Sequence, residues 1–184
     1  MRAPSPAVLP LLCALILALA AGCTSVQDRY KGGERDFRGG NMRLGEYSGA
    51  NLEGSRFDRS NLVWANFDNA RLRSASFVGC NLRGASFYAA DLRNTAFRAS
   101  VVAGANFGRA DLRGADLRGL NLSECKLTGA RLDGARLDKA NLSGLDLSNA
   151  TLRGTNLYGA RYDDATQWPA GFDASTSGAF KAGP

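Results

Sequence analysis

The chain has 184 residues, with 23 Lys plus Arg against 17 Asp plus Glu, four cysteines and no histidine. The lack of histidine excludes a Ser-His-Asp triad, a Cys-His pair, a histidine zinc site and a haem with a proximal histidine. A hydrophobic content of 45% is sufficient for a core, and the 22 glycines indicate many tight turns.

Residues 1–22 predict an export signal. Arg2 supplies a positive start, and residues 7–21 are apolar apart from Pro10. This run is shorter than the about 20 apolar residues that a membrane-spanning helix needs. Removal of this segment would leave 22 basic and 17 acidic residues, a formal charge of +5. No later segment of the sequence reads as a transmembrane span.

The end of the signal, Leu19-Ala20-Ala21-Gly22-Cys23, resembles the bacterial lipobox, although leucine stands one place earlier than usual. The resemblance implies that Cys23 becomes the new N-terminus, linked by a thioether to diacylglycerol, and that its amine can be acylated. Thr24 follows in place of the aspartate associated with inner-membrane retention, which favours the outer membrane. The alternative is an ordinary secretory signal, with Cys23 as an incidental thiol.

A period of five governs the body of the chain. From Phe37 to Tyr162, all 26 places spaced five apart hold an apolar side chain, without one insertion. The place two before each is usually Ala or another small residue, although Leu120 and Leu145 are larger. Asn or Asp is favoured directly before the apolar residue, and Gly two places after it, so the consensus is A-(N/D)-(L/F)-x-G.

A period of five fits neither an α-helix nor a straight strand. Five residues turn an α-helix by about 500°, which would spread these side chains around its circumference. The pattern instead predicts a square coil with one pentapeptide on each of its four sides. Successive turns stack about 4.8 Å apart through backbone hydrogen bonds, with the small and large residues inward.

These repeats resemble the pentapeptide-repeat family over residues 35–164. The resemblance implies an all-β fold, a right-handed quadrilateral β-helix of about 6.5 coils. It divides the chain into a lipoprotein signal peptide (1–22), a lipidated N-terminus and linker (23–34), the β-helix (35–164) and a C-terminal cap with a loose tail (165–184). In the cap, Trp168 and Phe172 can cover the last coil.

Residues one full turn apart should form columns along the coil. Phe37, Phe57, Phe77 and Phe97 make one predicted column of stacked rings, and Tyr47, Phe67, Phe87 and Phe107 make the opposite one. The recurring asparagines from Asn41 to Asn141, interrupted by Val101, predict a structural ladder. Cys80 and Cys125 should be buried free thiols, because their places in the coil are too far apart for a disulfide.

Two outward groups are candidate partner surfaces. Arg73, Arg93 and Arg113 form a basic column that could bind phosphate-bearing lipid, lipopolysaccharide or nucleic acid, but the intermixed aspartates favour a simple solvated surface. Leu44 and Trp64, with Val63 beside them, form an apolar patch. This patch could contact a partner or be covered by the linker.

The function predicted from these features is a non-catalytic rod for protein binding or scaffolding, tethered through Cys23 in the bacterial cell envelope. The alternative is a target-protecting protein like the gyrase-binding quinolone-resistance pentapeptide proteins, which the signal and the basic charge disfavour. No catalytic residues, metal site or cofactor are predicted, and nucleic acid is a disfavoured partner. The protein partner and the oligomeric state are not specified by the sequence.

Overall fold

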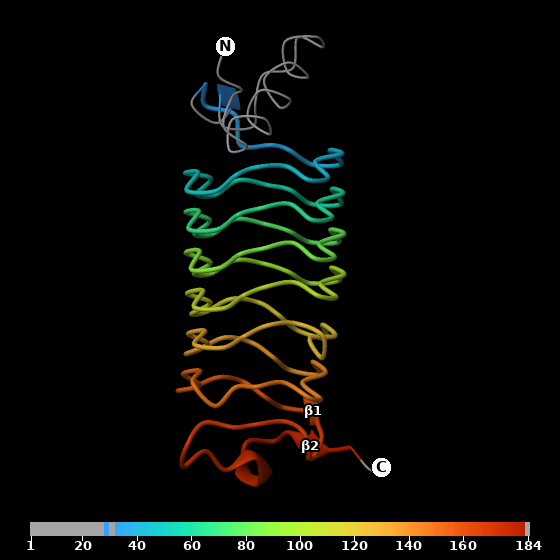
Figure 1. The fold of residues 1–184 in the computed structure, drawn as a ribbon, viewed down its shortest axis with the longest axis vertical. Coiled ribbons are helices and arrows are strands. Elements are labelled where there is room, and N and C mark those ends of the chain that lie inside the picture. Colours follow the sequence, from blue (N-terminus) through green and yellow to red (C-terminus); the bar gives the residue numbers. More distant parts are fainter. Residues whose placement is uncertain (1–27, 30–31, 183–184) are drawn as a thin grey trace, which may run out of the picture.

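The protein is a solenoid whose coils stack along one axis in sequence order (Figure 1). The computed structural model describes residues 28–29 and 32–182. The predicted signal and the predicted lipid attachment at Cys23 lie outside these residues. Among the described residues, no helix is both long enough and apolar enough to span a membrane.

Parallel backbone bridges between neighbouring coils hold the stack together. Asn41 pairs with Asn61, for example, and Asn61 with Asn81. The amide of Leu62 donates to the carbonyl of Asn81 at 2.8 Å, and the amide of Asn81 donates back to Ser60 at 3.0 Å. The register of these bridges therefore confirms which residues were predicted to lie above one another.

Left-handed backbone at the second turn residue of most pentapeptides explains the consensus glycine. Gly54 has a φ of 70° and Gly134 a φ of 67°, a region that glycine enters without a steric cost. Ten described residues other than glycine adopt the same conformation, among them Trp64 at 59° and Ala89 at 55°. The turn thus admits other residues where neighbouring contacts support them.

The predicted inward series forms the core. Leu92 and Leu132 are fully buried, as are the six phenylalanines from Phe57 to Phe107. Rings on neighbouring coils stack, with centroids 5.0 Å apart for both Phe57–Phe77 and Phe67–Phe87. Rings of the two opposite columns also meet edge to face, which fills the interior between them.

The small inward places bring polar side chains to the preceding coil. The Ser60 hydroxyl donates to the carbonyl of Phe37 at 3.0 Å, and the Cys125 thiol donates to that of Val102 at 3.1 Å. Cys80 and Cys125 are buried and free, as predicted. Burial raises the pKa of each thiol to about 12, so both stay protonated.

A short C-terminal segment follows the last coil. Strand β1, Arg161–Tyr162, pairs in parallel with β2, Phe180–Lys181, and the 3-10 helix η1, Ala174–Thr176, lies between them in sequence. Trp168 stacks on Phe172 at 5.0 Å and meets Tyr162 edge to face. Figure 1 shows this segment, in red, across the end of the coil stack.

Candidate functional site

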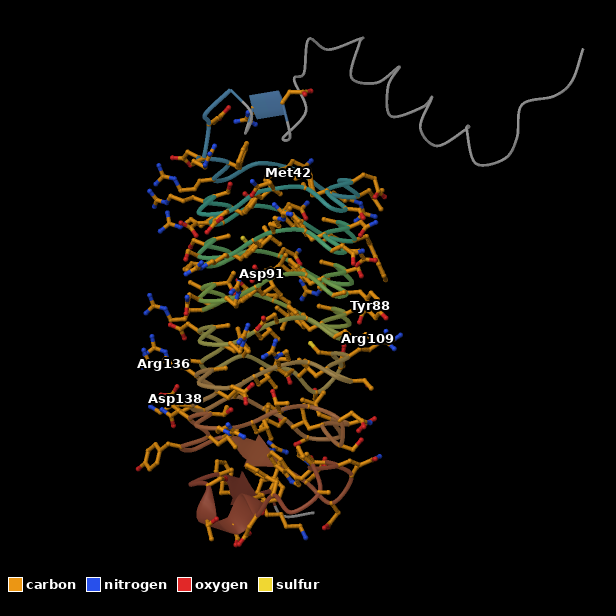
Figure 2. All side chains as sticks on the ribbon, turned by 90° about the vertical axis from the view of Figure 1, so that its left-hand side faces the viewer. Met42, Tyr88, Asp91, Arg109, Arg136 and Asp138 are labelled. Carbon is orange, nitrogen blue, oxygen red and sulfur yellow. The ribbon has the colours of Figure 1, made fainter. Side chains whose placement is uncertain are left out.

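The outward side chains fall into four rows of pentapeptides that run along the rod. We name each row after its first bridged residue: Asp36, Asn41, Glu46 or Asn51. The Asn41 row, for example, contains residues 40–44, 60–64, 80–84, 100–104, 120–124 and 140–144. Figure 2 shows Tyr88 and Arg109 of the Glu46 row on one side of the rod, and Arg136 and Asp138 of the Asp36 row on the other.

Two rows carry the ion pairs. Among the described residues between 36 and 138, every ion pair lies on the Asp36 row or the Asn51 row. The commonest form joins an arginine to the aspartate two residues before it. Arg93 donates through Nε to Asp91 at 2.8 Å and through Nη2 at 2.6 Å. Each of these pairs, in which the arginine holds the aspartate two residues before it in a fork, has the sequence D-(L/F)-R.

The three predicted arginines lie together. Arg73, Arg93 and Arg113 line a surface cavity of about 270 Å³ with Asn94 and Gly114. Arg93 is held by Asp91, and Arg113 by Asp111. No hydrogen bond or ion pair joins the guanidinium of Arg73 to another described residue. In this column, the guanidinium of Arg73 is without a hydrogen bond or ion pair to a described residue, whereas the charges of Arg93 and Arg113 are largely neutralised by their aspartates.

Three aspartates that accept hydrogen bonds from arginine have lowered pKa values. The hydrogen bond from Arg93 is the main cause of the lowered pKa of Asp91. The hydrogen bond from Arg118 acts in the same way on the pKa of Asp116, and that from Arg38 lowers the pKa of Asp36 to about 2. These carboxylates thus remain ionised at pH values where a free aspartate is already protonated.

Replacing Asp91 with asparagine will lower the free energy of unfolding by about 0.5 kcal/mol near neutral pH, the size of a partly exposed pair. A lowered folded-state pKa gives stability that is present above the ordinary pKa of 3.8 and is lost as the pH falls through the lower value. Urea unfolding of the wild type and variant at neutral and at strongly acidic pH measures this difference. Arg43→Gln, a change of an exposed arginine on the Asn41 row, is the control and should change neither curve. A difference between the wild type and Asp91→Asn that persists in acid would contradict the assignment.

The predicted apolar patch lies on the Asn41 row and is smaller than expected. Leu44 is 62% exposed and Trp64 is 59% exposed, whereas Val63 is only 9% exposed. Val63 therefore offers little surface to a partner. Leu44 and Trp64 are one coil apart, and the Leu44 amide donates to the Val63 carbonyl at 2.9 Å. The patch is on a different row from the arginine column.

An interruption of the backbone ladder was not predicted. Bridges join the Asn41 row from Asn41 to Val101 and again from Asn121 onward, but none joins Val101 to Asn121 among the described residues. On the Glu46 row, no bridge among the described residues joins Lys126 to Asp146. In both cases a large residue, Leu120 or Leu145, occupies the small inward place just before the second residue of the missing pair, which is the sequence signal for the interruption.

A cavity accompanies the first interruption. It has a volume of about 240 Å³, and its lining consists of Arg83, Ser100, Val101, Val102, Ala103, Asn121 and Glu124. The backbone amides of Val102, Gly104 and Asn121 make no hydrogen bond to any described residue, in contrast to their counterparts one coil earlier. We call this opening the Val101–Asn121 gap.

No group of three or more His, Cys, Asp and Glu residues that could hold a metal ion occurs in the described part of the chain. A surface cavity of about 690 Å³ is lined by the charged side chains of Asp36, Arg38, Arg56, Asp58 and Arg59, with Gly39 and Val78. Four of these ionisable groups are engaged in the pairs Arg38–Asp36 and Arg56–Asp58.

Comparison with known families identifies the repeats. The profile described as pentapeptide repeats (8 copies) matches residues 90–129, 105–144 and 130–161. A second profile, described as pentapeptide repeat region, matches residues 35–107. The two matches together cover the whole coil stack from 35 to 161. No curated protein matches the chain.

Several solved structures are similar to the chain. QnrB1, a plasmid-mediated fluoroquinolone resistance protein, is 18% identical, with 80% of this chain and 89% of that chain covered and a TM-score of 0.41. A pentapeptide repeat protein from Nostoc PCC 7120 is 25% identical, with 86% and 96% covered and a TM-score of 0.32. Another, from the Arabidopsis thaliana thylakoid lumen, is 29% identical, with 76% and 73% covered and a TM-score of 0.33.

Proposed function

Because this chain belongs to the pentapeptide-repeat family, we propose that it is a non-catalytic rod that binds a protein partner in the bacterial cell envelope. The observation that carries the proposal is the exposure of Leu44 and Trp64 on neighbouring coils that are joined by backbone hydrogen bonds. An exposed indole beside an exposed leucine favours contact with a partner. The well-packed core beneath them keeps such side chains at fixed spacing.

The finer geometry of the rod is part of the proposal. We take residues 35–164 as a right-handed quadrilateral β-helix of about 6.5 coils, with residues 165–184 as a cap and tail. Support comes from the register of the backbone bridges and the consensus of five. Since bridged residues are 20 apart and each repeat has five residues, one coil holds four pentapeptides.

A lipid on Cys23 is the proposed tether, with the outer membrane favoured over the inner. The support is the apolar run of residues 7–21, which ends in Ala20-Ala21 and is followed directly by Gly22-Cys23. Diacylglycerol with a further acyl chain, such as palmitate, would anchor the rod durably, whereas one chain binds a membrane only marginally. The rod would then present its rows to partners near that membrane.

The tether is tested by fractionating bacterial cells that produce the full-length chain. The wild type should enter the membrane fraction, incorporate radiolabelled palmitate and need detergent for release. Cys23→Ala should lose the label and the attachment. Cys13→Ala, a matched change within the apolar run, should retain both. Wild-type protein that is soluble and unlabelled would overturn the tether.

Protein binding is tested separately by photo-crosslinking in intact cells. A photoreactive residue in place of Trp64 should give a discrete adduct with one protein, and the same residue at Tyr158, an exposed control on the Asp36 row, should not. A further probe at Arg93 tests the arginine column. The absence of an adduct at both Trp64 and Arg93 would overturn protein binding by these surfaces, whatever the outcome for Cys23.

A further inference from the structure

The Asn41 row differs in charge from the rows with ion pairs. Between Asn41 and Gly104, its only charged residues are Arg43 and Arg83. The same stretch holds three of the large hydrophobic side chains that are exposed, Leu44, Trp64 and Val101, the last at 39%. A ligand that binds along this row would meet an apolar surface with amide side chains and little charge.

Trp64 forms a flat platform on this row. The indole atoms Cδ2, Cε3 and Cζ3 all lie close to where a side chain on Gly84 would begin, as when a ring covers that position with its face. Any side chain at Gly84 would therefore overlap the indole. Gly104, one coil further along, has only the backbone of Gly84 within 4 Å of that position. No side chain therefore lies against the Gly104 position.

Polar groups flank the platform at fixed places. The Asn61 amide donates to Asn41 Oδ1 at 3.2 Å, and Arg83 donates through Nη1 to Asn81 Oδ1 at 3.2 Å. These bonds orient side chains on the pentapeptide of Trp64 and on the coils on either side of it. An asparagine amide has further donor and acceptor capacity beyond one such bond.

The Val101–Asn121 gap extends the same row. Val102 and Asn121, whose backbone amides are unpaired, line its cavity together with Arg83 and Glu124, and the unpaired amide of Gly104 follows Ala103 of the same lining. Val102 is buried, and a buried amide almost always has a partner, which can be water or a ligand. The platform and the gap together give an apolar ring face followed by a cluster of hydrogen-bonding groups.

We infer that this surface binds a neutral oligosaccharide, with one sugar on the Trp64 indole and the chain directed along the Asn41 row toward the Val101–Asn121 gap. The C–H face of a pyranose is apolar and slightly positive, which suits the negative face of an indole. Sugar hydroxyls both donate and accept, as the amides and free backbone groups require. The coil spacing, about 4.8 Å, is close to the length of one pyranose unit.

The Asn41 row has few charges as far as Gly104, and in the gap Arg83 is accompanied by Glu124, so this surface has little net charge and does not favour an anion. A phosphate or carboxylate ligand would be drawn to the arginine column on the Asn51 row, where Arg73 is unengaged. An extended peptide is the competing occupant, because its backbone also donates and accepts. The inference does not require the lipid tether. Because the proposed protein partner also contacts Trp64, a sugar that binds there should compete with the protein adduct at this position.

The test is a titration of the ¹⁵N-labelled full-length protein, in a detergent without a sugar headgroup, followed by NMR. The probes are chitotetraose, cellotetraose and maltotetraose, with acetyl-trialanine amide and inorganic phosphate as comparisons. We expect at least one sugar to shift the Trp64 indole signal and the amides of Val102 and Gly104. The Trp168 indole, packed on Phe172 in the cap, should not move.

Matched variants make the result specific. Trp64→Ala should weaken sugar binding about tenfold or more, and the fold should persist because Ala89 and Ala99 occupy the same left-handed turn place. Tyr158→Ala, which removes a 72% exposed ring elsewhere, should leave the affinity unchanged. The inference is overturned if no sugar shifts Trp64, if only the peptide or phosphate does so, or if Trp64→Ala binds as tightly as the wild type.

Discussion

Replacing Phe87 with alanine will lower the free energy of unfolding by about 3–5 kcal/mol, and replacing it with aspartate will unfold the coils around it. Phe87 is fully buried and stacks with Phe67 at 5.0 Å and Phe107 at 5.2 Å. It also meets Phe77 and Phe97 edge to face at 5.5 and 5.7 Å. Aspartate would place an unpaired charge in this interior, a further cost of several kcal/mol.

The measurement is denaturant unfolding followed by circular dichroism. Phe87→Leu is the matched control, because Leu127 and Leu147 occupy later places in the same column and are buried there. We expect leucine to cost less than alanine, and alanine less than aspartate. An unchanged unfolding midpoint for Phe87→Asp would show that this side chain does not face the interior.

The core could be predicted from the sequence because one period determines it. Every fifth residue from Phe37 to Tyr162 is apolar. A coil of four pentapeptides places each member of this series above the member 20 residues earlier. The stacking of Phe57 on Phe77 follows directly from this register. The free, buried thiols of Cys80 and Cys125 follow as well, because the small place in the repeat faces inward.

The charged surface could be predicted only in part. The column of Arg73, Arg93 and Arg113 was evident from the spacing, but its pairing was not. The inward residue between Asp91 and Arg93 leaves both of these side chains on the outer surface, close enough to form a fork. This short-range pairing engages Arg93 within its own coil. The spacing had shown only that aspartates are intermixed with the column, which favoured a solvated surface over an anion-binding stripe.

The distribution of charge divides the rod into two kinds of surface. Ion pairs satisfy guanidinium groups of the Asp36 and Asn51 rows and maintain a hydrated surface there. The Asn41 row has few charges and instead exposes Leu44 and Trp64. An interaction surface on this row would lose little ionic solvation when it is covered, since few charges need to be dehydrated.

Leu120 marks the limit of prediction from the repeat. The sequence shows that Leu120 is larger than the residues at the same place in other repeats. It does not show whether neighbouring side chains rearrange to accommodate the leucine or whether the two coils move apart. Side chains at this place reach the preceding coil, as Ser60 does toward Phe37 at 3.0 Å. A leucine is too large for that space, so the chain from Asn121 stands away from Val101 and the bridge is absent.

Replacing Leu120 with alanine should therefore close the Val101–Asn121 gap. Loss of a buried leucine ordinarily costs about 2–5 kcal/mol, but here the restored backbone hydrogen bonds would return about 1 kcal/mol each. We expect Leu120→Ala to destabilise the rod by about 2 kcal/mol less than Leu117→Ala. Leu117 is the matched control, because it is fully buried and its pentapeptide keeps the bridge to the preceding coil, from Asp116 to Ala96.

Amide hydrogen exchange gives the second readout of this closure. In the wild type, the amides of Val102 and Asn121 have no partner among the described residues and should exchange faster than that of Leu82, which donates to Val101 at 2.7 Å. Leu120→Ala should slow both amides about tenfold or more, since each gains a hydrogen bond. Equal destabilisation by the two alanine variants, with exchange unchanged, would show that Leu120 does not hold the coils apart.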